Sequence, residues 1–204
     1  MTKAQAKWCA LVLAAGRSSR MGPQHKLLED LHGKPVIRHV IDHVKHAAFS
    51  SVLMVTGYRH QEVCLAAGEV AHVHNPDYQK GLSSSLQCGL EQVPADHAGV
   101  FVILGDMPFI MPQHFDDMME AMDANPDAQA LVPVVGGEWA HPVVIRRSLF
   151  PDLMRLEGDK GARALLKARS NTVLLWPSSD QTLLLDLDTP EALDKARLMP
   201  ASLL

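Results

Sequence analysis

Hydrophobic residues along this chain gather into short runs that are separated by amphipathic segments. Two runs, 8–14 and 100–104, are almost continuously apolar, which is typical of strands buried on both faces of a sheet. Similar patterns predict further strands at 51–56, 71–74, 130–135, 142–146, 172–176 and 183–186. Apolar residues at helical spacing predict helices at 35–49, 60–67, 83–93, 112–124, 149–154, 162–168 and 190–197.

The order of these elements predicts an α/β fold. Because strands alternate with helices, we expect three layers, with a mostly parallel central sheet covered on both faces. The less regular pattern after residue 130 predicts an antiparallel addition to this sheet. No linker or repeat interrupts residues 1–204, so we expect a single domain. Sheets of this kind bind ligands beyond the carboxyl ends of their strands, which directs attention to the polar segments there.

The composition of the chain argues against several classes of function. The net charge of −4 gives no global electrostatic reason to bind nucleic acid. No apolar run approaches the 18–20 residues that cross a bilayer, so no membrane association is expected. The apolar segment 8–15 follows two lysines but is short for a signal peptide and continues into a charged loop, so we expect a cytoplasmic protein. The three cysteines show no zinc-binding spacing and are expected to be reduced, with Cys9 in the core.

The first strand leads into a loop that is rich in glycine, hydroxyl and basic side chains. Backbone N–H groups, hydroxyls and fixed positive charge suit a polyphosphate, so a nucleoside triphosphate is the first ligand to consider. The glycine spacing matches neither the P-loop nor the dinucleotide-binding motif, and an ordinary basic surface loop is the alternative. The candidate nucleotide-binding residues here are Leu13, Ala14, Ala15, Gly16, Arg17, Ser18, Arg20 and Lys26.

Acidic residues follow two other strands. The strand at 100–104 ends at Gly105 and Asp106, which a parallel sheet would bring beside the first loop. A carboxylate there is a typical ligand of magnesium (Mg2+), and a cap on the following turn is the alternative. Asp188 could complete the magnesium site, or could cap the last helix. Alternation would point Asp186 to the same side, and it is the less favoured ligand.

A third polar segment precedes the helix predicted at 83–93. Gly81, Ser83, Ser84 and Ser85 can donate to a base, ribose or phosphate, and a plain helix cap is the alternative. His141, next to Pro142 and near a glycine turn, is placed beside a second substrate.

The other histidines are expected to play no part in the site. His39, His43 and His46 lie opposite the apolar stripe of their helix, where a solvated face is favoured over a metal site. His72 and His74 share one side of a strand, and we expect them to be structural.

These segments resemble the MobA-like nucleotidyltransferases over about residues 8–198. The first loop resembles the family signature through Leu13–Gly16, Ser18, Arg20–Gly22 and Lys26. Later segments fit in order, at 75–76, 81–86, 105–108, 141–143, 158–163 and 186–191. The His-Pro pair and the 158–163 segment are most similar to the molybdenum cofactor cytidylyltransferases. Ala15 stands where guanylyl-transferring relatives usually have glycine.

The resemblance implies a Rossmann-like nucleotidyltransferase fold and transfer of CMP from CTP to the terminal phosphate of molybdenum-bound molybdopterin. It implies Arg20, Lys26 and Asp106 as catalytic residues and magnesium held by Asp106 and Asp188. It also allows delivery of the product to a molybdenum hydroxylase. The alternatives are another nucleotide such as GTP, another acceptor such as a sugar or isoprenoid phosphate, or a pterin-cofactor chaperone without turnover.

Overall fold

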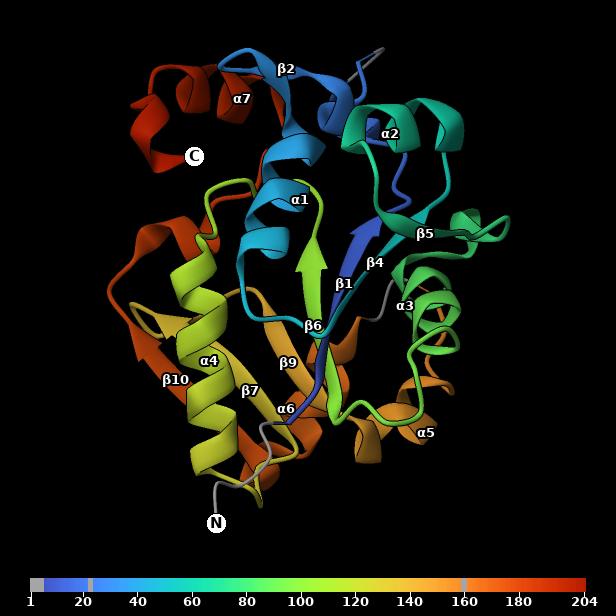
Figure 1. Ribbon diagram of the computed structural model, residues 1–204, viewed down its shortest axis with the longest axis vertical. Helices are drawn as coiled ribbons and strands as arrows, with labels where there is room; N and C mark the ends of the chain where they lie inside the picture. Colours follow the sequence, from blue (N-terminus) through green and yellow to red (C-terminus); the bar gives the residue numbers. More distant parts are fainter. Residues whose placement is uncertain (1–5, 22–23, 159–160) are drawn as a thin grey trace.

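The computed structural model describes residues 6–21, 24–158 and 161–204. Its main sheet has the strand order β10-β7-β9-β6-β1-β4-β5, with β8 paired to β7 (Figure 1). Its first four strands in chain order, all mutually parallel, are β1 (Trp8–Ala14), β4 (Ser51–Thr56), β5 (Ala71–His74) and β6 (Gly99–Leu104). The α/β class and the parallel centre of the sheet are therefore confirmed.

The antiparallel addition lies in the region where the sequence predicts it. β9 (Val143–Arg146) runs antiparallel to both β6 and β7 (Ala130–Val135). β10 (Val173–Ser178) is parallel to β7, and β8 (Glu138–Trp139) turns back against it. A separate hairpin joins β2 (Asp30–Leu31) to β3 (Lys34–Pro35).

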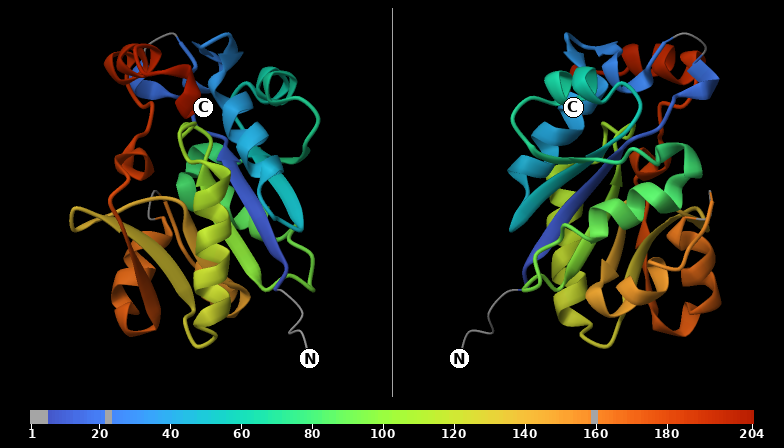
Figure 2. Two further views of the ribbon diagram at one scale, coloured as in Figure 1. Left: turned by 60° about the vertical axis from the view of Figure 1, so that its left-hand side comes forward. Right: turned by 90° about the vertical axis from the view of Figure 1, so that its right-hand side faces the viewer.

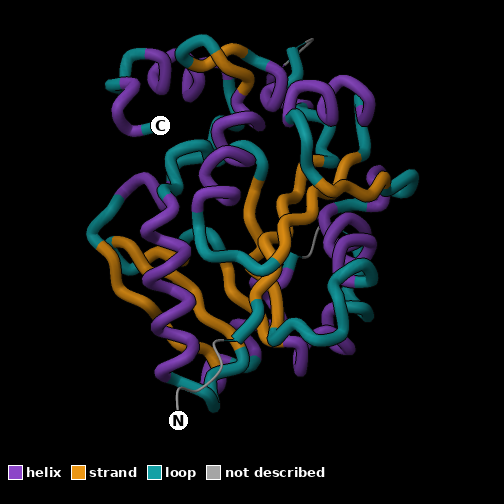
Figure 3. The backbone as a smooth tube through the Cα atoms, in the orientation of Figure 1, coloured by secondary structure: helices purple, strands orange, loops and turns teal. Residues whose placement is uncertain are grey.

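Helices cover both faces of the sheet (Figures 2 and 3). One core cluster combines side chains of α1 (Val36–His46), α2 (His60–Ala67) and α4 (Pro112–Ala124) with one face of the sheet. The other combines α3 (Leu82–Leu90), α5 (Phe150–Leu153) and α6 (Ala162–Ala168) with the opposite face. α7 (Pro190–Arg197) lies beyond the carboxyl ends of β1 and β6 (Figure 1).

The interior strand β1, which lies between β6 and β4, shows why an apolar run without alternation predicts a buried strand. All seven residues of β1 are buried. Ala10 and Val12 belong to the α1 side of the core, whereas Cys9, Leu11 and Leu13 belong to the α3 side. Because successive side chains point to opposite faces, both faces of this strand need apolar residues.

One predicted strand is wrong. Residues 183–186 are not a strand, because the chain forms a 3-10 turn at Gln181–Leu184. The Asp180 carboxylate accepts a hydrogen bond from the Thr182 N–H at 2.9 Å and begins this turn. The apolar residue that suggested a strand, Leu183, is fully buried in the core all the same.

The expected solvated histidine face of α1 is also wrong at two positions. His39 and His43 are buried, with 6% and 8% exposure. Their imidazoles donate to the main-chain carbonyls of Leu31 at 2.7 Å and Ile110 at 3.1 Å. α1 is covered on a second side by the hairpin and the segment before α4, so polar positions beside the apolar stripe become buried too.

No helix among the described residues has both the length and the apolar character that crossing a membrane requires.

Candidate functional site

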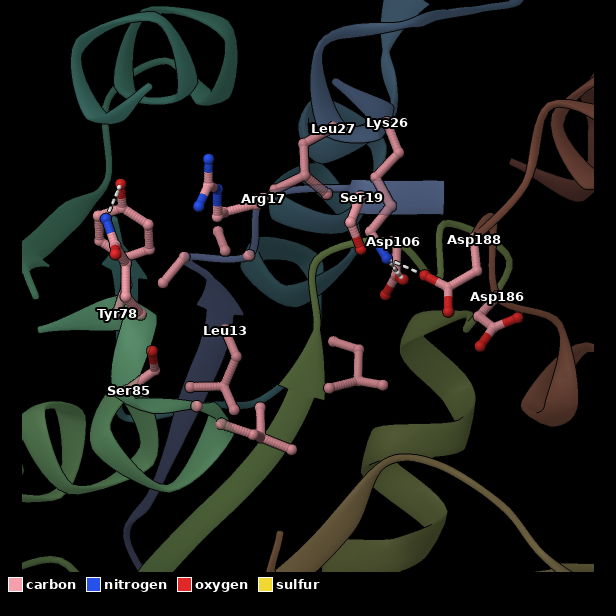
Figure 4. A pocket seen from close by; sticks show the side chains of 17 residues that line it. Leu13, Arg17, Ser19, Lys26, Leu27, Tyr78, Ser85, Asp106, Asp186 and Asp188 are labelled. Carbon is pink, nitrogen blue, oxygen red and sulfur yellow. Dashed lines mark hydrogen bonds and ion pairs between the residues drawn. The ribbon is translucent and has the colours of Figure 1, made fainter. Parts of the chain in front are cut away.

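The candidate site lies at the carboxyl ends of β1 and β6. These strands pair in parallel, with Leu13 opposite Leu104, so the loops that follow them emerge side by side. Between them opens a cavity of about 520 Å³ (Figure 4). It is lined by the β1 loop, the segment that leads into α3, and the acidic residues that follow β6 and precede α7.

Three carboxylates meet on one side of this cavity. Asp106, Asp186 and Asp188 each offer an oxygen atom, and these atoms lie within 4.8 Å of one another. The two acidic segments are joined through the main chain, because the Leu187 N–H donates to the Asp106 carbonyl at 3.0 Å. Leu187 is itself fully buried, which anchors the acids on either side of it. The predicted convergence of these residues is therefore what the structure shows.

The helix-cap alternative for Asp188 does not apply. The cap of α7 is Thr189, whose hydroxyl accepts from the Ala192 N–H at 3.2 Å. Both oxygens of Asp188 are used elsewhere: Oδ1 contacts Lys26, and Oδ2 accepts from Arg20 at 2.6 Å.

Lys26 is the central cation of the cluster. Its ammonium group contacts the carboxylates of both Asp106 and Asp188, as the dashed lines of Figure 4 show. Its side chain is only 16% exposed, and that of Asp106 only 8%. A charged network with so little solvent is stable only because its members neutralise one another.

Burial and charge act in opposite directions on these groups. Burial raises the pKa of Asp106, and Lys26 offsets part of that rise. Burial also acts to raise the pKa of Asp188, but the bond to Lys26 and the charge of Arg20 outweigh it, and the pKa is lowered. For Lys26 burial acts to lower the pKa, yet the two carboxylates outweigh it and the pKa is raised. Positive charge beside the acids therefore favours the ionised form of Asp188 and opposes the effect of burial on Asp106.

The β1 loop is fixed by its own hydrogen bonds. Ser18 adopts a left-handed backbone conformation with φ 55°, and its hydroxyl accepts from the Lys26 N–H at 3.3 Å. The buried His25 ring bonds the Gly16 carbonyl at 3.2 Å and stacks on Tyr58 at 5.7 Å. The Arg17 guanidinium lies 5.6 Å from the same tyrosine ring. These contacts hold the loop, and with it the backbone of Lys26, in place. Gly22 of the predicted motif lies outside the described residues.

The candidate residues near α3 have different surroundings in the structure. Gly81 lines the cavity, but the Ser83 hydroxyl donates to the Gly158 carbonyl at 2.7 Å. The Ser84 hydroxyl accepts from Asn75 and donates to main-chain carbonyls. The helix-cap alternative for the serines is wrong, since the cap position is Gly81 and no side chain caps α3.

A second cavity of about 260 Å³ adjoins the first. The two share Leu13, Leu82 and Leu104 in their walls. His141 lines the second cavity, and burial, together with the charge of Arg163, lowers its pKa to about 4. The imidazole is therefore neutral at pH 7. Residues 159 and 160 of the 158–163 segment lie outside the described part of the chain.

A protein-family comparison identifies the fold's relatives. Residues 10–173 match the MobA-like NTP transferase domain. The chain belongs to this family. It is thus a nucleotidyltransferase by family, as the signature residues of the first loop predict.

Individual relatives of this MobA-like transferase fall into several groups. The molybdenum cofactor cytidylyltransferase of Escherichia coli is 26% identical over 89% of this chain and 91% of its own length. The bifunctional protein GlmU of Sorangium cellulosum is 28% identical over 58% of this chain, which spans only 27% of that relative. The crystal structure of Rv0371c from Mycobacterium tuberculosis superposes with a TM-score of 0.83 at 25% identity, covering 96% of this chain and 100% of the other. A second structure of that protein is a complex with manganese.

Several residues that line the larger cavity of this MobA-like transferase were not predicted from the sequence. They are Leu27, Tyr78, Gln79, Leu82 and Leu104. Of the three serines expected to offer donors near Gly81, Ser85 lies in the cavity wall, one helical turn after Gly81. Tyr78 and Gln79 lie in a 3-10 turn that no periodic pattern announces.

Proposed function

We propose that this chain transfers CMP from CTP to the terminal phosphate of molybdenum-bound molybdopterin and releases pyrophosphate. The observation that carries the proposal is the cluster of Asp106, Asp186 and Asp188 around Lys26 and Arg20 at one wall of the larger cavity. The choice of CTP and of the pterin is supported by similarity to the Escherichia coli cytidylyltransferase over most of both chains.

The larger cavity is assigned to the nucleotide. Leu13, Ala15 and Gly16 form one wall, against which a base and ribose can lie. A Cβ at Gly16 would meet no heavy atom within 4 Å, so the backbone there is open to a close-lying ligand. Arg17 and Arg20 supply positive charge for the phosphates at the rim. Ser18, Ser83 and Ser84 act by holding the loops in place through their internal hydrogen bonds.

The carboxylate cluster fits a hard divalent cation. Three oxygen donors within 4.8 Å of one another, partly balanced by a lysine, suit magnesium (Mg2+), which prefers oxygen ligands. Asp106 and Asp188 would hold the ion, with Asp186 as a third candidate. When bound, the ion neutralises charge on the nucleotide phosphates.

The reaction needs positioning and charge rather than a proton acceptor. A pterin phosphate oxygen is already anionic and can attack the α-phosphorus directly, forming one P–O bond while the bond to the β-phosphate oxygen breaks. Two anions must approach each other, and Lys26 lowers that repulsion through its fixed charge. Arg20 stabilises the pyrophosphate that leaves.

The smaller cavity is assigned to the acceptor. Its wall combines neutral His141 with Trp139 and Arg163, whose guanidinium lies 5.9 Å from the tryptophan ring. An aromatic wall with a nearby cation suits a flat ring that carries a phosphate. Delivery of the product to a molybdenum hydroxylase belongs to the same proposal.

The test is pyrophosphate release from CTP, GTP and ATP, each with and without molybdenum-loaded molybdopterin. We expect release only with CTP, magnesium and the pterin together. Asp106→Asn should reduce it by 100-fold or more, on the order of the loss of one transition-state contact. Release with CTP and a sugar or isoprenoid phosphate, but not with the pterin, would instead establish a nucleotidyltransferase for another acceptor. Undiminished pterin delivery by Asp106→Asn would favour the chaperone.

A further inference from the structure

A second cluster of possible metal ligands lies at the opposite edge of the site-bearing sheet from β10. It joins α2 to the edge strand β5, which lie side by side in Figure 1. One donor atom each from His60, Cys64 and His72 lies within 4.8 Å of the others. The His74 ring is close as well, with its centroid 4.6 Å from that of His60. The proposed nucleotidyl transfer uses none of these residues.

The secondary structure explains why these side chains converge. His60 and Cys64 are four residues apart on α2 and therefore share one face of the helix. His72 and His74 are two residues apart on β5 and share one side of the strand. A helix face placed against a strand side thus brings together three imidazoles and one thiol.

The rings of His60 and His72 each have one nitrogen in a hydrogen bond and the other available. The His72 Nδ1 lies 3.2 Å from the Val70 carbonyl. A carbonyl only accepts, so this nitrogen carries the hydrogen and Nε2 keeps its lone pair. The His60 Nδ1 lies 2.8 Å from the Thr56 hydroxyl, which uses its single hydrogen on the Val73 carbonyl. With the hydroxyl hydrogen on that carbonyl, the His60 Nδ1 carries the ring hydrogen and faces both the Thr56 oxygen and the Cys64 Sγ at 3.5 Å, and the Nε2 keeps its lone pair.

This arrangement is the one that surrounds metal-binding histidines. A ligating imidazole usually donates its other N–H to a carbonyl or a similar acceptor, which fixes both the tautomer and the ring orientation. The Thr56 side chain is fully buried, and the acceptor at Val70 is a main-chain carbonyl, so both acceptors are held in place. Neutral imidazole and thiolate are ligands that zinc prefers, whereas magnesium prefers oxygen.

We propose that His60, Cys64 and His72 form a binding site for a borderline-soft divalent transition metal of the zinc class. His74 or a water molecule would complete four ligands. Donors in a tetrahedral zinc site lie roughly 3.5 Å apart, given bonds of about 2.0–2.3 Å. The donor atoms of the cluster lie within 4.8 Å of one another, and small rotations of the exposed His72 side chain can shorten these distances to those of a metal site. On binding, the Cys64 thiol loses its proton to solvent and the sulfur forms a bond to the metal.

Cobalt(II) is the probe, because a thiolate bound to it gives a charge-transfer absorption band that oxygen ligands do not give. The full-length chain is reduced, kept in excess magnesium to saturate carboxylate sites, and titrated with Co2+. We expect one equivalent to produce the thiolate band, and Zn2+ to displace it. Cys64→Ser should abolish the band, and His60→Gln or His72→Gln should weaken binding about 10-fold or more.

Matched substitutions separate this site from incidental binding. Cys88→Ser removes another partly exposed cysteine, and His46→Gln an exposed histidine outside the cluster, and both should leave the titration unchanged. His72 is exposed, so His72→Gln leaves the core intact and reports on binding alone. Absence of the band, its persistence in Cys64→Ser, or an affinity indifferent to both histidine substitutions would overturn the proposal. The outcome does not depend on whether the chain transfers nucleotides.

Discussion

At the scale of single residues, the candidate site is governed by one lysine between two acids. The Lys26 ammonium contacts Asp106 and Asp188, and each of these three pKa values reflects the others. The sequence indicated all three residues from their positions after predicted strands, although the strand predicted before Asp188 is a 3-10 turn. It could not show that the lysine contacts the acids directly, because a contact across 162 residues depends on the folded chain.

Replacing Lys26 tests this network. Lys26→Met leaves Asp106 without its cation and Asp188 with Arg20 alone, so we expect a loss of about 2–4 kcal/mol in the free energy of unfolding near neutral pH and little pyrophosphate release. Urea unfolding and the CTP assay measure the two effects. Lys34→Met is the matched control, since its ion pair with Asp42 is exposed and should contribute less than about 1 kcal/mol. Equal losses in the two variants would contradict the central role of Lys26.

His141 predicts a pH dependence of stability. Its pKa is lowered in the folded chain to about 4 from an ordinary value of 6.5, so the unfolded chain binds the proton more readily between these values. This contribution is complete above pH 6.5 and is lost as the pH falls towards 4, by up to about 3 kcal/mol. Urea unfolding of wild type and His141→Asn should therefore show a stability difference that changes over this window. A constant difference from pH 4 to 7 would contradict a buried neutral imidazole.

At the scale of elements, strand and helix positions follow from the sequence more closely than strand order does. The predicted bounds of β4, β5, α2 and α4 agree with the structure. The insertion of β9 between β6 and β7 has no local signal, because it depends on pairing between distant segments. The burial of His39 and His43 has the same origin, since the groups that cover them come from the hairpin and from the segment before α4.

Gly99 tests the junction where β9 joins the parallel strands. A Cβ there would lie 2.1 Å from the Ile145 carbonyl oxygen and 2.8 Å from the Arg146 Cα, and neither backbone atom can move without disturbing the sheet. Gly99→Ala should therefore cost about 2–4 kcal/mol of unfolding free energy. Gly136→Ala is the comparison: it meets nothing within 4 Å and should cost about 1–2 kcal/mol for its positive φ of 58°. Thermal or urea unfolding of both variants measures the difference, and a harmless Gly99→Ala would contradict the pairing.

At the scale of the whole molecule, two adjoining cavities share a wall at the carboxyl edge of the sheet. An α/β fold predicts ligand binding at this edge, and the candidate residues Lys26, Asp106 and Asp188 do lie there. The cavity boundaries and the second metal-ligand cluster were beyond the sequence, because both depend on how helices lie against the sheet. Cys64 showed no zinc spacing with the other cysteines, since its neighbours in space are histidines.

Ligand binding should raise the stability of the whole molecule. If the larger cavity takes CTP with magnesium, the pair together should raise Tm, by an amount equivalent to about 2.7 kcal/mol at 100 times Kd. CTP with a chelator should have a much smaller effect, and Asp188→Asn should remove most of the increase. Differential scanning fluorimetry measures these shifts. The same Tm increase with and without metal would contradict a role of the carboxylate cluster in nucleotide binding.

The hydrogen bond from Leu187 to the Asp106 carbonyl has a consequence for biosynthesis. Translation completes every strand that the structure describes by Ser178, yet Asp186 and Asp188 have not then been added. A chain that stops at that stage has every strand segment of the sheet but lacks two of the three clustered acids. Premature termination or proteolytic clipping between 178 and 186 would therefore remove two of the three clustered carboxylates and leave the Asp106 carbonyl without the N–H of Leu187.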